Sequence, residues 1–125
     1  MAAVNTIVYD DSTLLASKLL QISNTRQQII SNNLANASTP GYIRKELDFQ
    51  KSLSEQINSG DIRNVESVKG EVIDDMTEAP RVDGNNVTVA TELNQLMQNS
   101  VMSNLMAKAY TTKMNIIRNS IKNGG

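Results

Sequence analysis

Apolar residues recur every seven positions along the C-terminal part of the chain, over residues 91–122. One series begins at Leu93 and a second begins at Leu96, and neither glycine nor proline interrupts them. Two such series, offset by three residues, form the a/d seam of a coiled coil. We therefore predict one long helix here. Its seam residues are Leu93, Leu96, Tyr110, Met114, Ile117 and Ile121.

A second stretch with one apolar stripe covers residues 12–36. Its apolar positions advance by alternating steps of four and three, which places them on one face of a helix. The seam residues predicted there are Leu15, Leu19, Ile22 and Ile29. A long seam needs a partner helix, and these residues supply the matching stripe. The two ends of the chain should therefore meet.

The C-terminal helix also carries apolar residues outside its seam. A helix that is apolar on more than one face is normally buried on more than one face, so we expect contacts with other chains. Alternatively, the middle of the chain could fold over this row. Near the end of the first helix, asparagine amides could bond across an interface or cap the last turn. The expected intersubunit residues are Asn33, Asn36, Val101, Met102, Leu105, Met106 and Ile116.

Two turns divide the chain into three parts, residues 1–42, 43–90 and 91–125. The first helix should stop before a type II turn, because the residue that precedes a proline is pushed out of the helical region. The residues of the two turns are Thr39, Pro40, Gly41 and Tyr42, then Asp83, Gly84, Asn85 and Asn86. Between them we predict a short helix over residues 49–58 and a small hairpin over residues 62–75.

The amino-acid composition argues against a catalytic function. The chain has no histidine and no cysteine, so the usual general base and nucleophile are absent. No glycine-rich loop precedes a helix, and the acids of the middle segment lack metal-loop spacing, so a solvated acidic face is expected. We predict no catalytic, metal or cofactor site, no small-molecule substrate and no enzymatic activity.

The charges are unevenly distributed, although the formal net charge is only -1. Eleven of the thirteen acids lie within residues 46–92, whereas the helix after residue 92 is purely basic. No lysine and arginine cluster predicts nucleic-acid binding. The N-terminus shows no secretory signal pattern and no apolar run is long enough to span a membrane, so we expect any export to bypass the general secretory route.

The residues around the first turn resemble a known family. Residues 33–42, which read NLANASTPGY after an amphipathic helix, resemble the N-terminal signature of the axial proteins of the bacterial flagellum, which form its rod and hook. Asp48-Phe49 and the DGNNV run of residues 83–87 followed by Glu92 favour the B-type proximal rod proteins. The C-type rod proteins share the first signature and remain the nearest rival. The resemblance covers nearly all of the chain except residues 61–81.

The resemblance implies a mainly α fold. The N- and C-terminal helices would form an antiparallel coiled coil, the inner rod domain, with a small irregular, partly β middle segment outside it. It also implies a structural subunit of a hollow drive shaft that transmits torque and encloses the export channel. The expected partners are copies of the chain, other rod proteins, the membrane-embedded ring, the export gate and the flagellar type III export apparatus. The subunit would lie in the periplasmic rod of the basal body and be exported without a cleaved signal peptide.

A different functional class is also open at this stage. A soluble helical adaptor or export chaperone could use the methionine-rich row of the C-terminal helix as a reversible peptide groove. Such a protein would be stable as a small discrete oligomer. A rod subunit would instead order fully only beside its neighbours.

Overall fold

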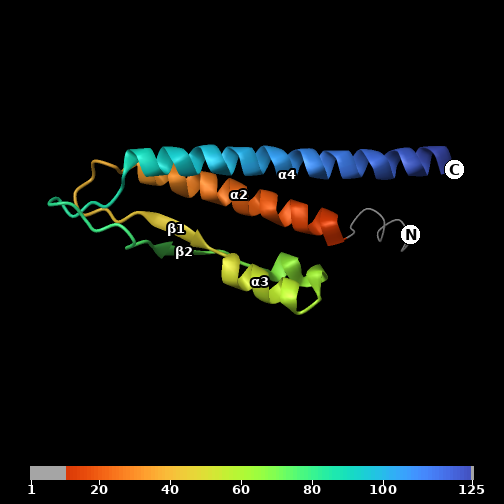
Figure 1. Ribbon diagram of the computed structural model, residues 1–125, viewed down its shortest axis with the longest axis horizontal. Coiled ribbons are helices and arrows are strands. Elements are labelled where there is room, and N and C mark those ends of the chain that lie inside the picture. The colour runs from red at the N-terminus through yellow and green to blue at the C-terminus, as the bar shows by residue number, and fades with distance from the viewer. Residues whose placement is uncertain (1–10, 125) are drawn as a thin grey trace.

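The computed structural model describes residues 11–124, without the side chains of residues 62, 63 and 66. The outermost residues of the expected terminal segments, 1–10 and 125, lie outside this description. Figure 1 shows a long, layered arrangement in which two terminal helices run beside a smaller middle segment. The elements in chain order are α2 (Asp11–Ala35), β1 (Lys45–Asp48), α3 (Gln50–Asn58), the 3-10 helix η1 (Ile62–Ser67), β2 (Glu71–Asp74) and α4 (Val89–Gly124).

The terminal helices pack side by side and run in opposite directions, which confirms the predicted fold class (Figure 1). A polar contact marks their crossing. Ser23 on α2 donates from its hydroxyl to the Asn99 side-chain oxygen on α4 at 3.0 Å, and the Asn99 amide donates to the Ser23 carbonyl at 2.8 Å. Both residues are buried, so the pair fixes the alignment of the two helices by hydrogen bonds as well as by apolar contact.

The seam of α4 differs by one position from the prediction. Glu92 and Asn99 are buried at 0% and 2% exposure, whereas Leu93 is 47% exposed. The first seam series therefore begins at Glu92, and the assignment of Leu93 was wrong. Hydrogen bonds from Asn33 on α2 and from Arg44, which lies outside the two helices, hold Glu92 inward, and an apolar pattern cannot detect a buried carboxylate.

The remaining seam residues are buried to different degrees. Ile121 is 50% exposed, so it is not buried in the seam as predicted, and Figure 1 shows the C-terminal end of α4 extending past the start of α2. Ile22 and Ile117 are buried. The half-buried members are Leu15, Leu19, Ile29, Leu96, Tyr110 and Met114.

The middle segment contains one antiparallel strand pair. β2 pairs with β1, with Lys45 opposite Asp74 and Asp48 opposite Glu71. The predicted hairpin over residues 62–75 was therefore wrong, because its first arm is η1 and its second arm pairs with a strand farther back in the chain. Val65 at 0% exposure shows why: it is buried as part of the core and does not face a neighbouring strand. The short helix expected over residues 49–58 is α3.

Candidate structural junction and assembly surface

A cluster of buried polar side chains joins the end of α2, the start of α4 and the middle segment. We call this cluster the junction. It consists of Asn33, Arg44, Asn85, Asn86 and Glu92, each between 0% and 4% exposed. Buried polar groups are costly unless every one finds a partner, so the hydrogen bonds of the junction decide how the segments meet.

Arg44 and Glu92 form the ion pair at the centre of the junction. The Arg44 Nε atom lies 2.6 Å from Glu92 Oε1, and the two side chains are 5% and 0% exposed. Arg44 also pairs with Asp75, and its Nη2 atom donates to Gln95 Oε1 at 3.2 Å. Burial lowers the pKa of Arg44, but the hydrogen bond and charge of Glu92 and the charges of Asp75 and Glu46 together outweigh it, so the pKa is raised overall. The guanidinium therefore stays charged and links three segments.

Two further carboxyl groups border this ion pair with opposite pKa shifts. Burial raises the pKa of Glu46, and a hydrogen bond with Asp75 raises it further. Burial also acts to raise the pKa of Asp75, yet hydrogen bonds from Thr77 and the charge of Arg44 lower it overall. The negative charge is thus held mainly on Asp75, next to the guanidinium.

Both the nitrogen and the oxygen of the Asn33 side-chain amide form hydrogen bonds within the chain. Its Nδ2 atom donates to the Lys45 carbonyl at 2.9 Å and to Glu92 Oε2 at 3.3 Å. Its Oδ1 atom accepts from the Lys45 backbone at 2.9 Å and from the Tyr42 hydroxyl at 3.0 Å. The prediction that Asn33 lies in an intersubunit interface was therefore wrong, because its burial and its partners are internal.

Asn36 is half-buried and acts as a local cap. Its amide donates to the Asn32 carbonyl at 2.8 Å, and its Oδ1 atom accepts from the Thr39 hydroxyl at 3.1 Å. The structure shows the capping role, and the place of Asn36 in an intersubunit interface stays a prediction.

The two predicted turns lie against each other. In the first, the Tyr42 backbone donates to the Thr39 carbonyl at 3.2 Å and Gly41 has φ 74, as a type II turn around Pro40 requires. Gly41 in turn donates to the Asp83 carbonyl of the second turn at 2.8 Å. A Cβ atom on Gly84, whose φ is 85, would lie 3.1 Å from the Gly41 Cα. Both glycines are therefore required by conformation, and Gly84 also by space.

The two asparagines after the second turn extend this contact. Asn85 donates to the carbonyls of Asn36 at 2.8 Å and Thr39 at 2.9 Å, which ties the second turn to the end of α2. Asn86 donates to the Asp75 carbonyl at 2.7 Å and accepts from the Arg44 backbone at 2.7 Å. One pair of adjacent side chains thus holds both the helix end and the strand pair.

Sequence reasoning identified the turn residues but missed the part that Arg44 and Asn99 play. Glu92 carried a usable signal, because it is the single acid in a helix whose later charges are all basic. A lone carboxylate at a seam position indicates a buried cation partner nearby.

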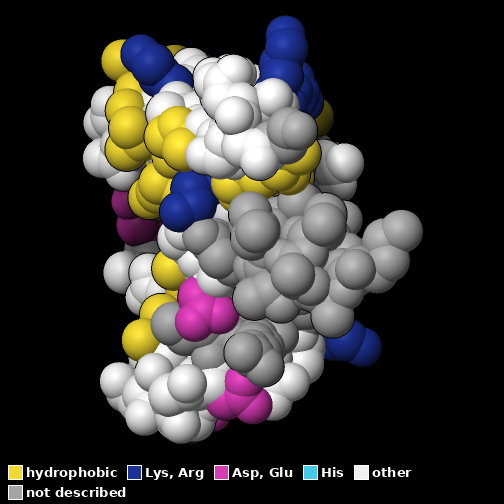
Figure 2. All heavy atoms as spheres, turned by 90° about the vertical axis from the view of Figure 1, so that its right-hand side faces the viewer, with side chains coloured by type: hydrophobic (Ala, Val, Ile, Leu, Met, Phe, Trp, Pro, Cys, Tyr) yellow, Lys and Arg dark blue, Asp and Glu magenta, His cyan; other side chains and the backbone are white. Residues whose placement is uncertain are grey.

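The outer face of α4 is the second candidate region. We call Val101, Met102, Leu105, Ala109 and Ile116 the α4 row. Val101, Leu105 and Ile116 are 68%, 59% and 57% exposed, and Met102 is 43% exposed. Met106, predicted with them, is half-buried and so lies nearer the seam. Within residues 11–124 the middle segment does not cover this row. Figure 2 shows hydrophobic and basic side chains gathered at the α4 end of the molecule.

The described residues include neither a metal-binding cluster nor a helix suited to crossing a membrane. No group of histidine, cysteine or carboxylate side chains in that part of the chain is arranged to hold a metal ion. None of its helices combines the length and the apolar character that crossing a membrane demands.

Comparison with known proteins places these features in context. The family model described as "Flagella basal body rod protein" matches residues 20–42, which include most of α2, Asn33 and the first turn. The flagellar basal body rod protein FlgB of Cereibacter sphaeroides is 26% identical over 102 residues, covering 74% of this chain and 80% of that protein. FlgB of Borreliella burgdorferi is 25% identical, covering 87% and 96%, and FlgB of Escherichia coli is 22% identical, covering 92% and 96%.

These matches support a flagellar basal-body rod protein of the FlgB type. They support a structural rod subunit that assembles with other flagellar rod components at the basal body. They give no support to a soluble adaptor or export chaperone. Flagellar rod proteins are structural proteins and not enzymes. The matched segment includes Asn33 of the junction and also Tyr42, whose hydroxyl donates to Asn33, so part of the segment that resembles the family helps to join the segments of this fold.

Proposed function

We propose that this chain assembles through the α4 row with neighbouring subunits into the proximal rod, a hollow shaft that transmits torque and encloses the export channel. The exposure of the α4 row carries the proposal. Val101, Leu105 and Ile116 are more than half exposed on a helix whose opposite face is already packed on α2. Burying such side chains at a neighbour would contribute about 1.5–3 kcal/mol for each one fully covered. The subunit has a mechanical role and no enzymatic activity.

The proposal extends to the organisation of the chain and its partners. Residues 1–42 and 91–125 would form the inner rod domain, and residues 43–90 the outer segment. Neighbours would include copies of this chain, other rod proteins, and the membrane-embedded ring and export gate at the rod base. The subunit would reach the rod through the flagellar type III export apparatus without a cleaved signal peptide. The antiparallel helix pair and the position of the middle segment on one side of it support this arrangement (Figure 1).

A triple substitution tests the proposal in the native host. Val101, Leu105 and Ile116 are changed to glutamine, which forms helix well but removes the apolar surface. The host's own copy is deleted, and swimming and the recovery of rods from purified basal bodies are measured. We expect the variant protein to be made and folded but swimming and rod assembly to be lost.

A matched control uses three exposed apolar residues outside α4. Val72, Met76 and Val82 are 55%, 60% and 110% exposed, so changing them to glutamine removes similar apolar surface elsewhere. This control should swim. Normal swimming and normal rods in the α4 row variant would refute the proposal.

A further inference from the structure

The α4 row is bordered by charge of one sign. A shallow hollow of about 320 Å3 is formed along α4 by Leu105, Lys108, Ala109, Thr112, Lys113 and Ile116. Residues advance by about 100° around a helix, so Lys108 and Lys113 lie on opposite sides of the line through Leu105 and Ile116. After Glu92 the charged residues of α4 are Lys108, Lys113, Arg118 and Lys122. The row therefore has a lysine on each edge, and α4 itself contributes no acid after Glu92.

This border disfavours pairing of the row with the same row of a second copy. Two such rows, packed face to face, would bring lysine edges together in either direction, and like charges across a contact are destabilising. The apolar side chains alone would permit that pairing, but the charges of the bordering lysines disfavour it.

The α-helices α2 and α3 of a second copy do not supply the complementary surface either. Their acids are Asp11 at the first residue of α2 and Glu55 on α3. On α3 the apolar side chains Leu53 and Ile57 lie about 40° apart, whereas Glu55 lies about 200° from Leu53, on the opposite side. An acid in that position cannot border an apolar stripe.

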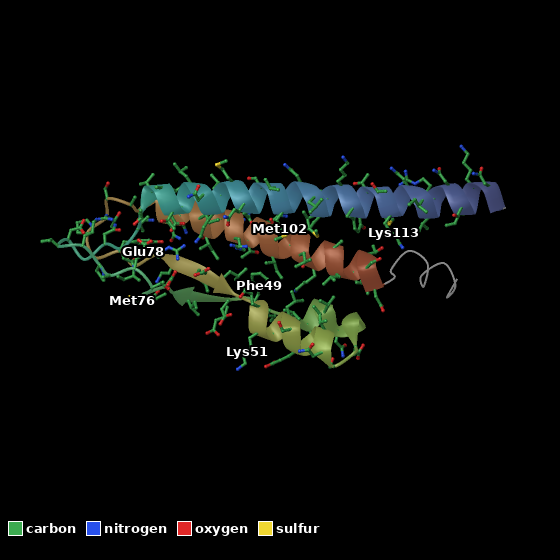
Figure 3. The ribbon with its side chains drawn as sticks, in the orientation of Figure 1. Phe49, Lys51, Met76, Glu78, Met102 and Lys113 are labelled. Carbon is green, nitrogen blue, oxygen red and sulfur yellow. The ribbon has the colours of Figure 1, made fainter. Side chains whose placement is uncertain are left out.

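We propose that the α4 row binds an amphipathic helix of a different protein, one whose apolar stripe is bordered by aspartate or glutamate. The inference rests on the proposed function, since it names the occupant of the same assembly surface. Figure 3 shows Met102 and Lys113 along α4, well away from the junction. The contact would join unlike chains, while copies of this chain meet through other surfaces.

Binding of two designed peptides to the purified full chain tests the proposal. Both peptides are helical and share one leucine stripe; one has glutamate and the other lysine at the bordering positions. Fluorescence anisotropy of labelled peptide gives the affinities at low salt. We expect the glutamate peptide to bind about tenfold more tightly, since several exposed charge pairs of modest strength add up.

Three single substitutions test whether the preference for the glutamate peptide depends on the α4 row. Lys108→Glu should reduce the preference about threefold, because one border charge is reversed. Lys51→Glu makes the same charge change at an exposed position on α3 and should leave the preference unchanged. Leu105→Gln should weaken the binding of both peptides.

Equal binding of the two peptides would overturn the inference, as would binding that Leu105→Gln leaves intact. A dimer of the chain that Leu105→Gln dissociates would also overturn it, since the row would then hold a second copy. These outcomes are separate from the proposed function. If the glutamine triple variant fails to assemble but the peptides show no charge preference, only the identity of the partner is wrong.

Discussion

The two ends of the helix pair differ in which kinds of side chain they bury and which they expose. At the junction end, Arg44, Glu92 and Asn33 are almost fully buried, and partners within the chain satisfy their charges and amides. Toward the other end, α4 exposes Leu105 and Ile116 beyond half of their surface. Polar groups are thus buried where apolar ones would be expected, and apolar groups are exposed where polar ones would be expected.

This difference separates what the chain completes alone from what it leaves to a neighbour. Buried polar contacts are directional, so they specify how α2, the strand pair and α4 meet. Exposed apolar side chains are non-directional and become stabilising only when another surface covers them. Substitutions should therefore lower the stability of the isolated chain strongly at the junction and weakly along the α4 row.

Removing the central carboxylate should cost most. Glu92→Ala leaves the Arg44 guanidinium buried without its 2.6 Å partner, and breaking a buried ion pair in this way costs about 3–5 kcal/mol. Urea unfolding of the purified chain measures the loss. Glu55→Ala, an exposed glutamate of α3, is the matched control and should change the free energy of unfolding by less than about 0.5 kcal/mol. A similar small change for Glu92→Ala would mean that the ion pair does not hold the junction.

Removing the amide that joins the turns should have a smaller effect. Asn85→Ala deprives the Asn36 and Thr39 carbonyls of their donor in a fully buried position, at a cost of about 1–3 kcal/mol. The same unfolding measurement applies. Asn94→Ala, at an exposed position of α4, serves as control and should show no loss of stability. Equal stabilities of the two variants would contradict the role given to Asn85.

Acid should weaken the junction through Asp75. Its pKa is lowered in the folded chain, so its stabilising contribution is present above the ordinary aspartate pKa of about 4 and is lost as the pH falls through the lowered value. Glu46 acts oppositely: its pKa is raised, so its contribution is present at low pH and is lost as the pH rises through the raised value.

Two variants separate these contributions in urea unfolding between about pH 3 and pH 7. Asp75→Asn should flatten the loss of stability in acid, because it removes the group responsible. Glu46→Gln should steepen the loss, because it removes the opposing contribution. The same pH dependence in both variants and the parent would show that these carboxyl groups are not linked to folding.

Changing the α4 row should affect the isolated chain least. Leu105→Gln alters an exposed position, so the free energy of unfolding should change by no more than about 0.5 kcal/mol. Ile22→Ala, at a buried position on α2, should cost about 2–5 kcal/mol under the same conditions. A large loss for Leu105→Gln would mean that the row is already covered within one chain, and the contrast between the two ends would disappear.

The sequence predicted the helices well because their signal is periodic. The seven-residue spacing identified α4, and the stripe ending at Pro40 and Gly41 identified α2 and its stop. The same signal misplaced one seam series by a residue. A periodic apolar pattern detects only apolar side chains, so the prediction placed Leu93 in the seam and left out Glu92. The burial of Glu92 depends on Arg44 from another segment.

The middle segment was harder to predict for a different reason. The hairpin predicted over residues 62–75 included a strand where β2 lies, but it gave that strand a neighbouring segment as its partner. The actual partner, β1, is held in place by Asn33 on α2 through both backbone groups of Lys45. Pairing set by a third element leaves no trace in the pattern of either strand. The residues around the two turns were identifiable, whereas their contact with each other was not.

The unbroken course of α4 has a mechanical consequence. Glycine and proline are absent between Val89 and Asn123, so this helix has no built-in hinge. At about 1.5 Å per residue it is a stiff rod of roughly 50 Å, clamped at its first turn and extending past α2 at its other end. A sideways force on the extended end would therefore not be absorbed by local bending. It would act as a lever on the contacts that hold α4 in place, first the Ser23–Asn99 hydrogen bonds with α2 and then the Arg44–Glu92 ion pair.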